Sequence, residues 1–188
     1  SLVGSEMCIR DRFFFTRVRV VNETGDDCGP DEPGEVLVKG PHIMVGYLNR
    51  EDATAESIVD GWLRTGDVAV MDADGFVYIQ DRVKDMIISG GENVYPAEIE
   101  NAIFGMEGVN EVAVIGIPSE KWGESPLAVV VRADDSVTED AVLDHVSGKL
   151  ARFKQPKKVE FVDVIPRNPT GKVLKRVLRD QFADVSAE

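Results

Sequence analysis

The stretch from Asp81 to Glu100, which reads DRVKDMIISGGENVYPAEIE, constrains the fold more than any other part of the chain. The apolar residues 86–88 end at Ser-Gly-Gly (residues 89–91), and two adjacent glycines permit backbone angles that other residues resist. Pro96 then stands where a helix can begin, and carboxylates in the next turn favour a start there. The stretch therefore predicts a short strand, a glycine loop and a helix in close succession.

The residue pattern differs on the two sides of this stretch. Before it, short apolar runs alternate with turns, and Asp-Ala-Asp-Gly at residues 72–75 is typical of a hairpin turn. After it, strand and helix patterns alternate. The predicted strands are residues 17–21, 35–38, 68–71, 76–79, 86–88, 109–117, 126–131 and 158–162, and the predicted helices are residues 49–58, 96–104, 138–150 and 173–182.

These patterns predict an α+β chain in three parts. Residues 1–12 fit nothing that follows and are interpreted as a non-native leader, the alternative being an ordinary frayed terminus. Residues 13–81 should form a small antiparallel β subdomain or barrel. Residues 82–188 should form an α+β domain of about a hundred residues, which is a usual domain size.

The charge of the chain is unevenly distributed. The formal net charge is -13, which argues against a general nucleic-acid binder. Residues 148–180, however, hold ten Lys or Arg against three Asp or Glu. A basic segment on an acidic body indicates a local phosphate-binding surface, although composition alone also fits a solvated basic face.

The cysteines and the apolar runs bear on the cellular compartment. Cys8 and Cys28 have neither metal-ligand spacing nor the pattern of a disulfide framework, so a reducing compartment is expected. No apolar run approaches the roughly 20 residues that a membrane helix needs. Charged residues interrupt the N-terminus where a signal peptide would be apolar. The sequence predicts a cytoplasmic protein without a membrane span.

Three places carry groups suited to chemistry. Asp67 follows Thr-Gly at the mouth of a strand, where its carboxylate can accept two hydrogen bonds from the ribose diol; the alternative is a carboxylate that satisfies a turn. Arg82 offers a planar fork of donors to phosphate or ribose, or a surface ion pair with Asp81 or Asp85. Gly90 and Gly91 leave the backbone bare for a slim ligand, or simply make a tight turn.

The third place is the loop at residues 165–172, IPRNPTGK. Two prolines and a glycine present Lys172 just before the last predicted helix. An ammonium there can bridge a carboxylate and a phosphate as charge builds between them; the alternative is a solvated lysine. The loop is not a Walker phosphate loop, because the earlier glycine and the following Ser or Thr are missing.

Four motifs in order resemble those of the adenylate-forming enzymes, which include acyl-CoA synthetases, peptide-synthetase adenylation domains and luciferases. They are GEVLV with GYL (residues 34–38 and 46–48), WLRTGD (62–67), the stretch 81–100, and PRNPTGK (166–172). The resemblance covers nearly everything after residue 12. The sequence ISGGENVYPAEIE is more similar to that of fatty-acyl and aryl-CoA ligases than to that of the peptide-synthetase adenylation domains.

The resemblance implies a two-step reaction, in which a carboxylic acid and ATP form an acyl-adenylate and CoA then captures the acyl group. Asp67 would hold the ribose of ATP or AMP, and Arg82 would contact ribose or phosphate. Lys172 would stabilise the adenylation transition state. Lys84 occupies the hinge position, which is often Asp in the family. Gly91, with Gly90 beside it, would line the passage for the pantetheine arm of CoA.

The resemblance also defines what this sequence lacks. The family's phosphate loop, its acid-binding pocket and the acidic residue that holds Mg²⁺ would all lie upstream, so the chain resembles a C-terminal fragment: the last part of the large AMP-binding domain plus the mobile domain. We expect it to be inactive alone, and the acid that is activated cannot be read from it. The alternatives are a non-catalytic binding or regulatory module of the same fold and an adenylation domain that loads a carrier protein.

Overall fold

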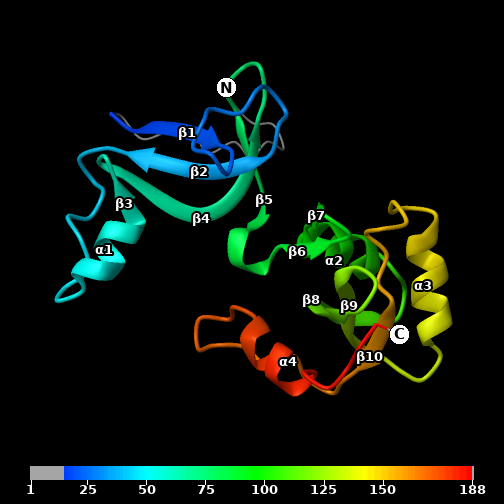
Figure 1. Cartoon of the computed structure of the whole chain (residues 1–188). Coiled ribbons are helices and arrows are strands. Elements are labelled where there is room, and N and C mark those ends of the chain that lie inside the picture. Colours follow the sequence, from blue (N-terminus) through cyan, green and yellow to red (C-terminus); the bar gives the residue numbers. More distant parts are fainter. Residues whose placement is uncertain (1–14, 188) are drawn as a thin grey trace, which may run out of the picture. The chain divides into compact units, whose positions relative to one another are not determined.

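The computed structural model describes residues 15–187, so the predicted leader at residues 1–12 and Cys8 lie outside the described residues. The chain divides into two compact units, residues 1–84 and 85–188. The division falls within a short 3-10 helix, η1 (Val83–Asp85). The sequence placed its domain boundary three residues earlier. Figure 1 shows the elements of each unit in chain order.

The first unit is an antiparallel sheet with one short helix. The strand order is β1-β2-β4-β3, with β5 paired to β4. Its core is small: Val20, Val36 and Ala69 are buried, and Cys28 is among the half-buried side chains around them. The elements are β1 (Arg17–Val21), β2 (Gly34–Lys39), α1 (Glu51–Ser57), β3 (Ile58–Val59), β4 (Trp62–Met71) and β5 (Val77–Arg82).

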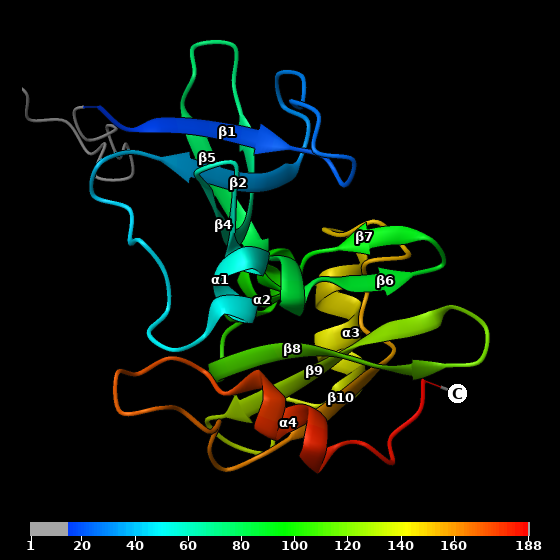
Figure 2. The same ribbon diagram turned by 60° about the vertical axis from the view of Figure 1, so that its left-hand side comes forward.

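The second unit is a mixed sheet covered by helices on both faces (Figure 2). Strands β8 and β9 form a long antiparallel hairpin, and β10 pairs in parallel with β9. The elements are β6 (Ile87–Ser89), β7 (Glu92–Val94), α2 (Pro96–Phe104), β8 (Val109–Ser119), β9 (Gly123–Arg132), α3 (Glu139–Ser147), β10 (Lys158–Phe161) and α4 (Lys175–Gln181).

Alternation along β8 and β9 builds two separate cores. Val114, Ala128 and Val130 point to the face that α2 and α3 cover. Ile115, Leu127 and Val129 point to the opposite face, which α4 covers through Leu178. Because successive strand residues face opposite sides of a sheet, a run of apolar residues in such a strand is buried on both sides. The predicted α+β class is confirmed.

Two predictions of local structure were wrong. Asp67 lies inside β4 rather than at the mouth of a strand over residues 68–71, because the strand begins at Trp62 and includes Gly66 as a strand irregularity at a φ of +72°. The segment after the glycines is a strand, β7, rather than a loop, because Val94 pairs with Ile87 and is fully buried. Residues 87–94 therefore form a hairpin.

The ends of the helices also follow from named contacts. Helix α3 begins after Thr138, whose hydroxyl accepts from the Ala141 N–H at 3.2 Å, as an N-cap residue does. Helix α4 begins at Lys175, two residues later than predicted. Val173 forms a bridge with Arg167, and the Leu174 N–H donates to Pro166 O at 2.8 Å, which keeps this segment extended.

Candidate functional site

Asp67 and Arg82 face each other across neighbouring strands of the first unit. They are register partners in the β4–β5 pair, and Arg82 Nε lies 3.3 Å from Asp67 Oδ1. The two side chains are 32% and 49% exposed, so both charges remain accessible to a ligand. The structure therefore brings together two residues that the sequence singled out separately. The Arg82 backbone N–H also donates to Asp81 Oδ1 at 2.7 Å, and Asp85 forms an ion pair with Arg179.

Glu35 on β2 fixes the backbone beside Asp67. Its carboxylate forms an ion pair with Arg64 and accepts from the Gly66 N–H at 3.2 Å. The Thr65 hydroxyl donates to Val36 O at 2.9 Å and accepts from the Asp67 N–H at 3.1 Å. These contacts hold the Thr-Gly-Asp segment with the Asp67 carboxylate at the strand surface. Sequence reasoning did not identify Glu35 as a partner of this segment.

Gly90 and Gly91 form the two-residue turn of the β6–β7 hairpin. Both have positive φ, +62° and +87°, which is the backbone that a type I′ hairpin turn requires. The Gly90 N–H donates to Trp122 O at 2.9 Å, and a Cβ on Gly90 would meet the Trp122 ring at 2.8 Å. A Cβ on Gly91 would meet nothing within 4 Å. Gly90 is therefore packed against Trp122, whereas the space beside Gly91 is free of other described atoms.

A cavity of about 510 Å³ opens beside this turn. Its described lining combines cations, aromatic rings and one buried hydroxyl group: Ser89, Lys121, Trp122, Arg152, Phe153 and Lys157. Trp122 and Phe153 are 42% and 39% exposed, which is high for large rings. Arg152 and Lys157 come from the basic segment that the sequence linked to phosphate. The lining residues Lys121, Trp122 and Phe153 were missed, although the pairings Lys-Trp and Arg-Phe-Lys are visible in the sequence.

Lys172 lies in a compact loop between β10 and α4. The Asn168 side chain accepts from the backbone N–H groups of Thr170 and Lys172, at 3.0 and 2.9 Å. Gly171 has a φ of +85°, as its place in this turn requires. The Lys172 side chain is exposed, and within residues 15–187 its ammonium has no hydrogen-bond or ion-pair partner. The loop is therefore braced while its cation stays available.

The Lys172 loop and the glycine turn lie at opposite ends of β8. Arg167 ties the loop to Glu111 near the start of β8, at 2.7 Å. The glycine turn meets the other end, where Ser89 pairs with Gly123, the register partner of Ser119. The eight-residue separation of Glu111 and Ser119 spans about 26 Å at ~3.3 Å per residue. Figure 2 shows the orange loop and the β6–β7 hairpin at these two ends.

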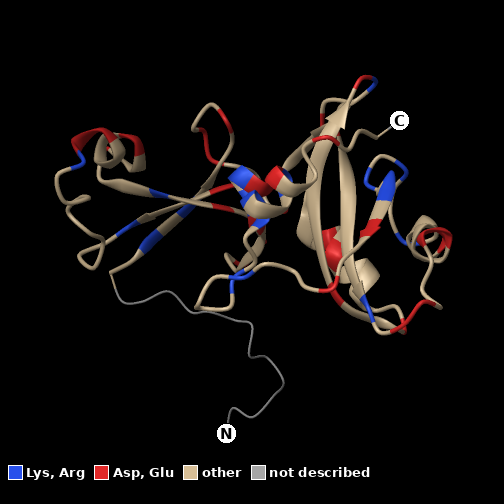
Figure 3. Cartoon of the chain, turned by 90° about the horizontal axis from the view of Figure 1, so that it is seen from below, with Lys and Arg blue, Asp and Glu red and all other residues tan. Residues whose placement is uncertain are grey.

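The basic segment is not one continuous cationic face. Four of its ten cations hold carboxylates of the second unit: Lys154 with Glu98, Arg167 with Glu111, Lys175 with Glu100, and Arg179 with Asp85. Asp85 follows Lys84, which is exposed at the division between the units. Figure 3 shows that acidic and basic residues occur in both units. Part of the local positive charge is thus neutralised, and the cations outside these four ion pairs include Arg152 and Lys157 at the cavity and Lys172 on its loop.

Within residues 15–187, no group of three or more His, Cys, Asp or Glu side chains is placed to hold a metal ion. None of the helices in the same part of the chain is long and apolar enough to cross a membrane.

Comparison with known proteins shows which family shares these features. Residues 98–172 match the AMP-binding enzyme C-terminal domain. The chain is 55% identical over 150 residues to a long-chain-fatty-acid–CoA ligase, FadD13, of Mycobacterium tuberculosis, a match that covers 80% of this chain and 30% of the relative. It is 50% identical over 170 residues to a feruloyl-CoA synthase of Amycolatopsis sp., covering 90% of this chain and 35% of that protein.

A solved structure extends the match to the fold. The crystal structure of ATP-bound MatB from Rhodopseudomonas palustris superimposes with a TM-score of 0.86 at 44% identity, over 90% of this chain and 34% of that one. The chain belongs to the adenylate-forming, AMP-binding enzymes. Within that class, the curated relatives named above are acyl-CoA ligases and synthases, and the chain spans about a third of their length.

Proposed function

We propose that this chain works as part of an acyl-CoA synthetase for fatty or aryl acids. In the first step, an acid oxygen attacks the α-phosphorus of ATP, a phosphorus–oxygen bond forms, and pyrophosphate leaves. In the second step, the thiolate sulfur of CoA attacks the acyl carbon, a thioester forms, and AMP leaves. The proposal covers a whole enzyme, of which residues 13–81 would complete the large domain and residues 82–188 would form the mobile one.

The observation that carries the proposal is the separation of two functional features on one compact unit. An exposed lysine on a braced loop and a bare glycine turn beside a cationic cavity lie at opposite ends of β8. Features about 26 Å apart along a strand cannot meet one small reacting centre at the same time. A unit that turns between two orientations would present each in its own step.

In the first step, Asp67 would accept hydrogen bonds from the ribose hydroxyls, and Arg82 would hold the carboxylate in place and reach ribose or phosphate. Their ion pair supports this arrangement because it fixes both groups at one surface of β4 and β5. Lys172 would supply positive charge where the acid oxygen and the α-phosphate meet. A preorganised cation at the site where charge develops is among the largest contributions to catalysis.

In the second step, Gly91 would let the pantetheine arm pass close to the backbone. The nucleotide end of CoA would occupy the cavity, where Trp122 and Phe153 offer ring faces for adenine and the neighbouring cations offer donors for phosphates. Such a cavity favours CoA over a carrier protein, whose pantetheine arm has no adenine. No specific observation favours the non-catalytic module.

Lys84 is proposed as the pivot between the two orientations. The units have separate cores, with the described core residues of the first at positions 20–69 and those of the second at 87–178. An exposed backbone segment between two such cores can change its dihedral angles at little cost in packing. We also propose that Mg²⁺ accompanies ATP, held outside this chain, and that the enzyme is cytoplasmic, as the thiol argument suggests.

A chimera tests the proposal. This chain would replace the equivalent segment of the M. tuberculosis ligase relative, and ATP–pyrophosphate exchange and acyl-CoA formation would be measured with fatty and aromatic acids. The relative without that segment is the control, and we expect activity only in the chimera. The 188-residue chain alone should release no pyrophosphate. A folded chimera that binds ATP but catalyses neither step would contradict the proposal.

A further inference from the structure

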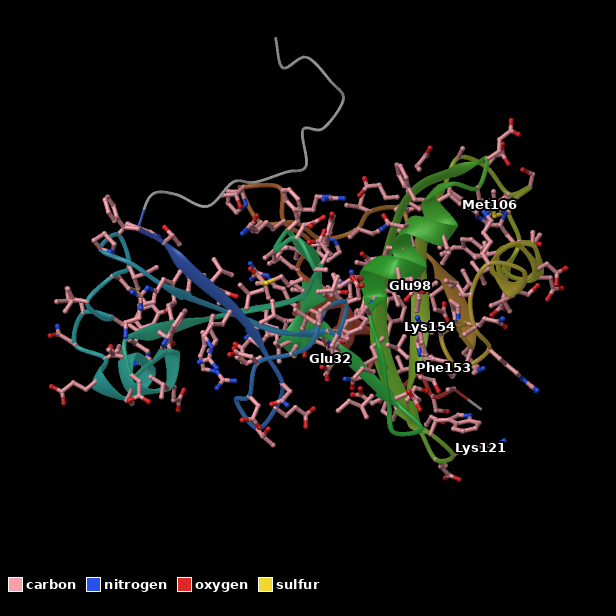
Figure 4. All side chains as sticks on the ribbon, turned by 90° about the horizontal axis from the view of Figure 1, so that it is seen from above. Glu32, Glu98, Met106, Lys121, Phe153 and Lys154 are labelled. Carbon is pink, nitrogen blue, oxygen red and sulfur yellow. The ribbon has the colours of Figure 1, made fainter. Side chains whose placement is uncertain are left out.

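Glu98 and Lys154 form an ion pair that joins α2 to the loop after α3. Lys154 Nζ lies 2.7 and 3.0 Å from the two carboxylate oxygens of Glu98. The Lys154 side chain is 24% exposed and the Glu98 side chain is 41% exposed, so the pair is partly shielded from water. Figure 4 labels both residues, with Phe153 beside Lys154 on the same loop. The pair joins positions 56 residues apart and is a tertiary contact.

This pair fastens the part of the loop that bears the cavity wall. Gln155 holds the far side by donating to the carbonyls of Ser147 and Leu150, and the Lys157 N–H donates to Pro126 O. Between the buried Leu150 and Lys154, the bonds seen within the described residues are limited to a single turn bond from Lys154 N–H to Ala151 O. Lys154 Nζ also lies 5.8 Å from the centroid of the Phe153 ring, so one ammonium contacts both Glu98 and the aromatic part of the cavity wall.

We propose that Glu98 and Lys154 are positioning residues for the CoA step. Their ion pair fixes the Arg152–Phe153 wall relative to α2, the helix that begins two residues after the glycine hairpin. The distance between the cavity and the passage for the pantetheine arm is thereby held constant. Neither residue needs to touch CoA. The proposal rests on the function proposed above, and it predicts an effect on the second step alone.

The sign of the charge separates positioning from simple electrostatics. CoA is an anion, so removing the Lys154 cation would weaken its binding through long-range attraction, whereas removing the Glu98 anion would strengthen it. Loss of positioning predicts weaker CoA binding in both variants, because either substitution releases the same loop. The two single variants therefore give opposite shifts under one account and equal shifts under the other.

The test uses Lys154→Met and Glu98→Ala in the ligase chimera. We expect the KM for CoA to rise about fivefold in both variants, which corresponds to ~1 kcal/mol, the upper end for a partly exposed pair. ATP–pyrophosphate exchange should be unchanged. With pantetheine, which has no nucleotide, variants and parent should react equally. Lys154→Arg should restore the KM, and Lys149→Met, which removes a neighbouring cation outside the pair, is the matched control.

Each other outcome overturns a defined part of the account. Shifts in opposite directions, or an equal loss with pantetheine, would show a charge effect or a general structural role instead of positioning. An active chimera whose KM for CoA does not move in either variant would overturn the positioning pair but leave the proposed function standing. A folded parent chimera without activity would overturn the proposed function, and thermal melts of all variants would exclude simple unfolding.

Discussion

Arg82 Nε lies 3.3 Å from Asp67 Oδ1 across the β4–β5 strand pair, so a carboxylate and a guanidinium share one surface of the first unit. We expect Asp67→Asn and Arg82→Met each to raise the KM for ATP in the ligase chimera by about tenfold or more, because each removes charge-assisted hydrogen bonds. Steady-state kinetics with varied ATP checks this. Arg50→Met is the matched control, since Arg50 pairs with Asp52 on an exposed helix end. An equal change in that control would contradict a specific role.

The two glycines of the β6–β7 turn should differ in their tolerance of a side chain. Both have positive φ, which costs a non-glycine residue ~1–2 kcal/mol. A Cβ at position 90 would also press on the Trp122 ring at 2.8 Å, which should add about 1–3 kcal/mol. We therefore expect Gly90→Ala to lower the free energy of unfolding more than Gly91→Ala. Chemical denaturation of the two variants measures the difference, and equal losses would contradict the packing of Gly90 against Trp122.

The thiol of Cys28 should react slowly. Burial, together with the nearby carboxylates of Glu32 and Asp27, raises the pKa of Cys28 above its ordinary value. The thiolate is the reactive form, so less of it is present at neutral pH. In a Cys8→Ser background, which leaves a single thiol, alkylation at pH 8 should be slower than that of free cysteine and should accelerate in urea. A rate equal to free cysteine would contradict this.

The turn at Asp72 should make the first unit sensitive to acid. The Phe76 N–H donates to Asp72 Oδ1 at 2.9 Å and is the main reason why the pKa of Asp72 lies below its ordinary value of 3.8. A lowered pKa in the folded state means stabilisation that is present above the ordinary value and is lost as the pH falls through the folded one. Asp72→Asn should therefore be less sensitive than the parent to unfolding between pH 5 and about pH 2. Circular dichroism against pH tests this, and identical acid profiles would contradict it.

Most strands and helices of the second unit could be predicted from the sequence, because the spacing of apolar residues within each element indicates which of its faces are buried. Residues 112–118 of β8 and 126–131 of β9 are continuously apolar where both sheet faces are covered. The glycine turn, Lys172 and the Asp67 carboxylate could be proposed as site residues from the sequence because each motif is contiguous. What escaped prediction depends on distant partners. The Asp67–Arg82 pair needs the β4–β5 register, and β7 needs Ile87 opposite Val94.

The cavity illustrates the same limit. Trp122 comes from the β8–β9 turn, Phe153 from the loop after α3, and Ser89 from β6. No spacing rule links these positions, because they come from three separate elements that only the tertiary fold brings together. The ion pairs of the basic segment are likewise invisible in composition, which is why a count of ten cations overstates the charge that a ligand would meet.

The most direct measurement compares the two half-reactions of the chimera carrying Lys172→Ala. If this lysine serves only the step in which the acid meets ATP, acyl-adenylate formation should fall by about 10²–10³-fold. Conversion of a supplied acyl-adenylate to the CoA thioester should remain within about twofold of the parent, because the glycine turn at the other end of β8 is intact. Arg176→Ala, an exposed neighbour on α4, should alter neither rate. An equal loss of rate in both half-reactions, or no loss in either, would contradict the proposal that Lys172 serves the first step and the glycine turn serves the second.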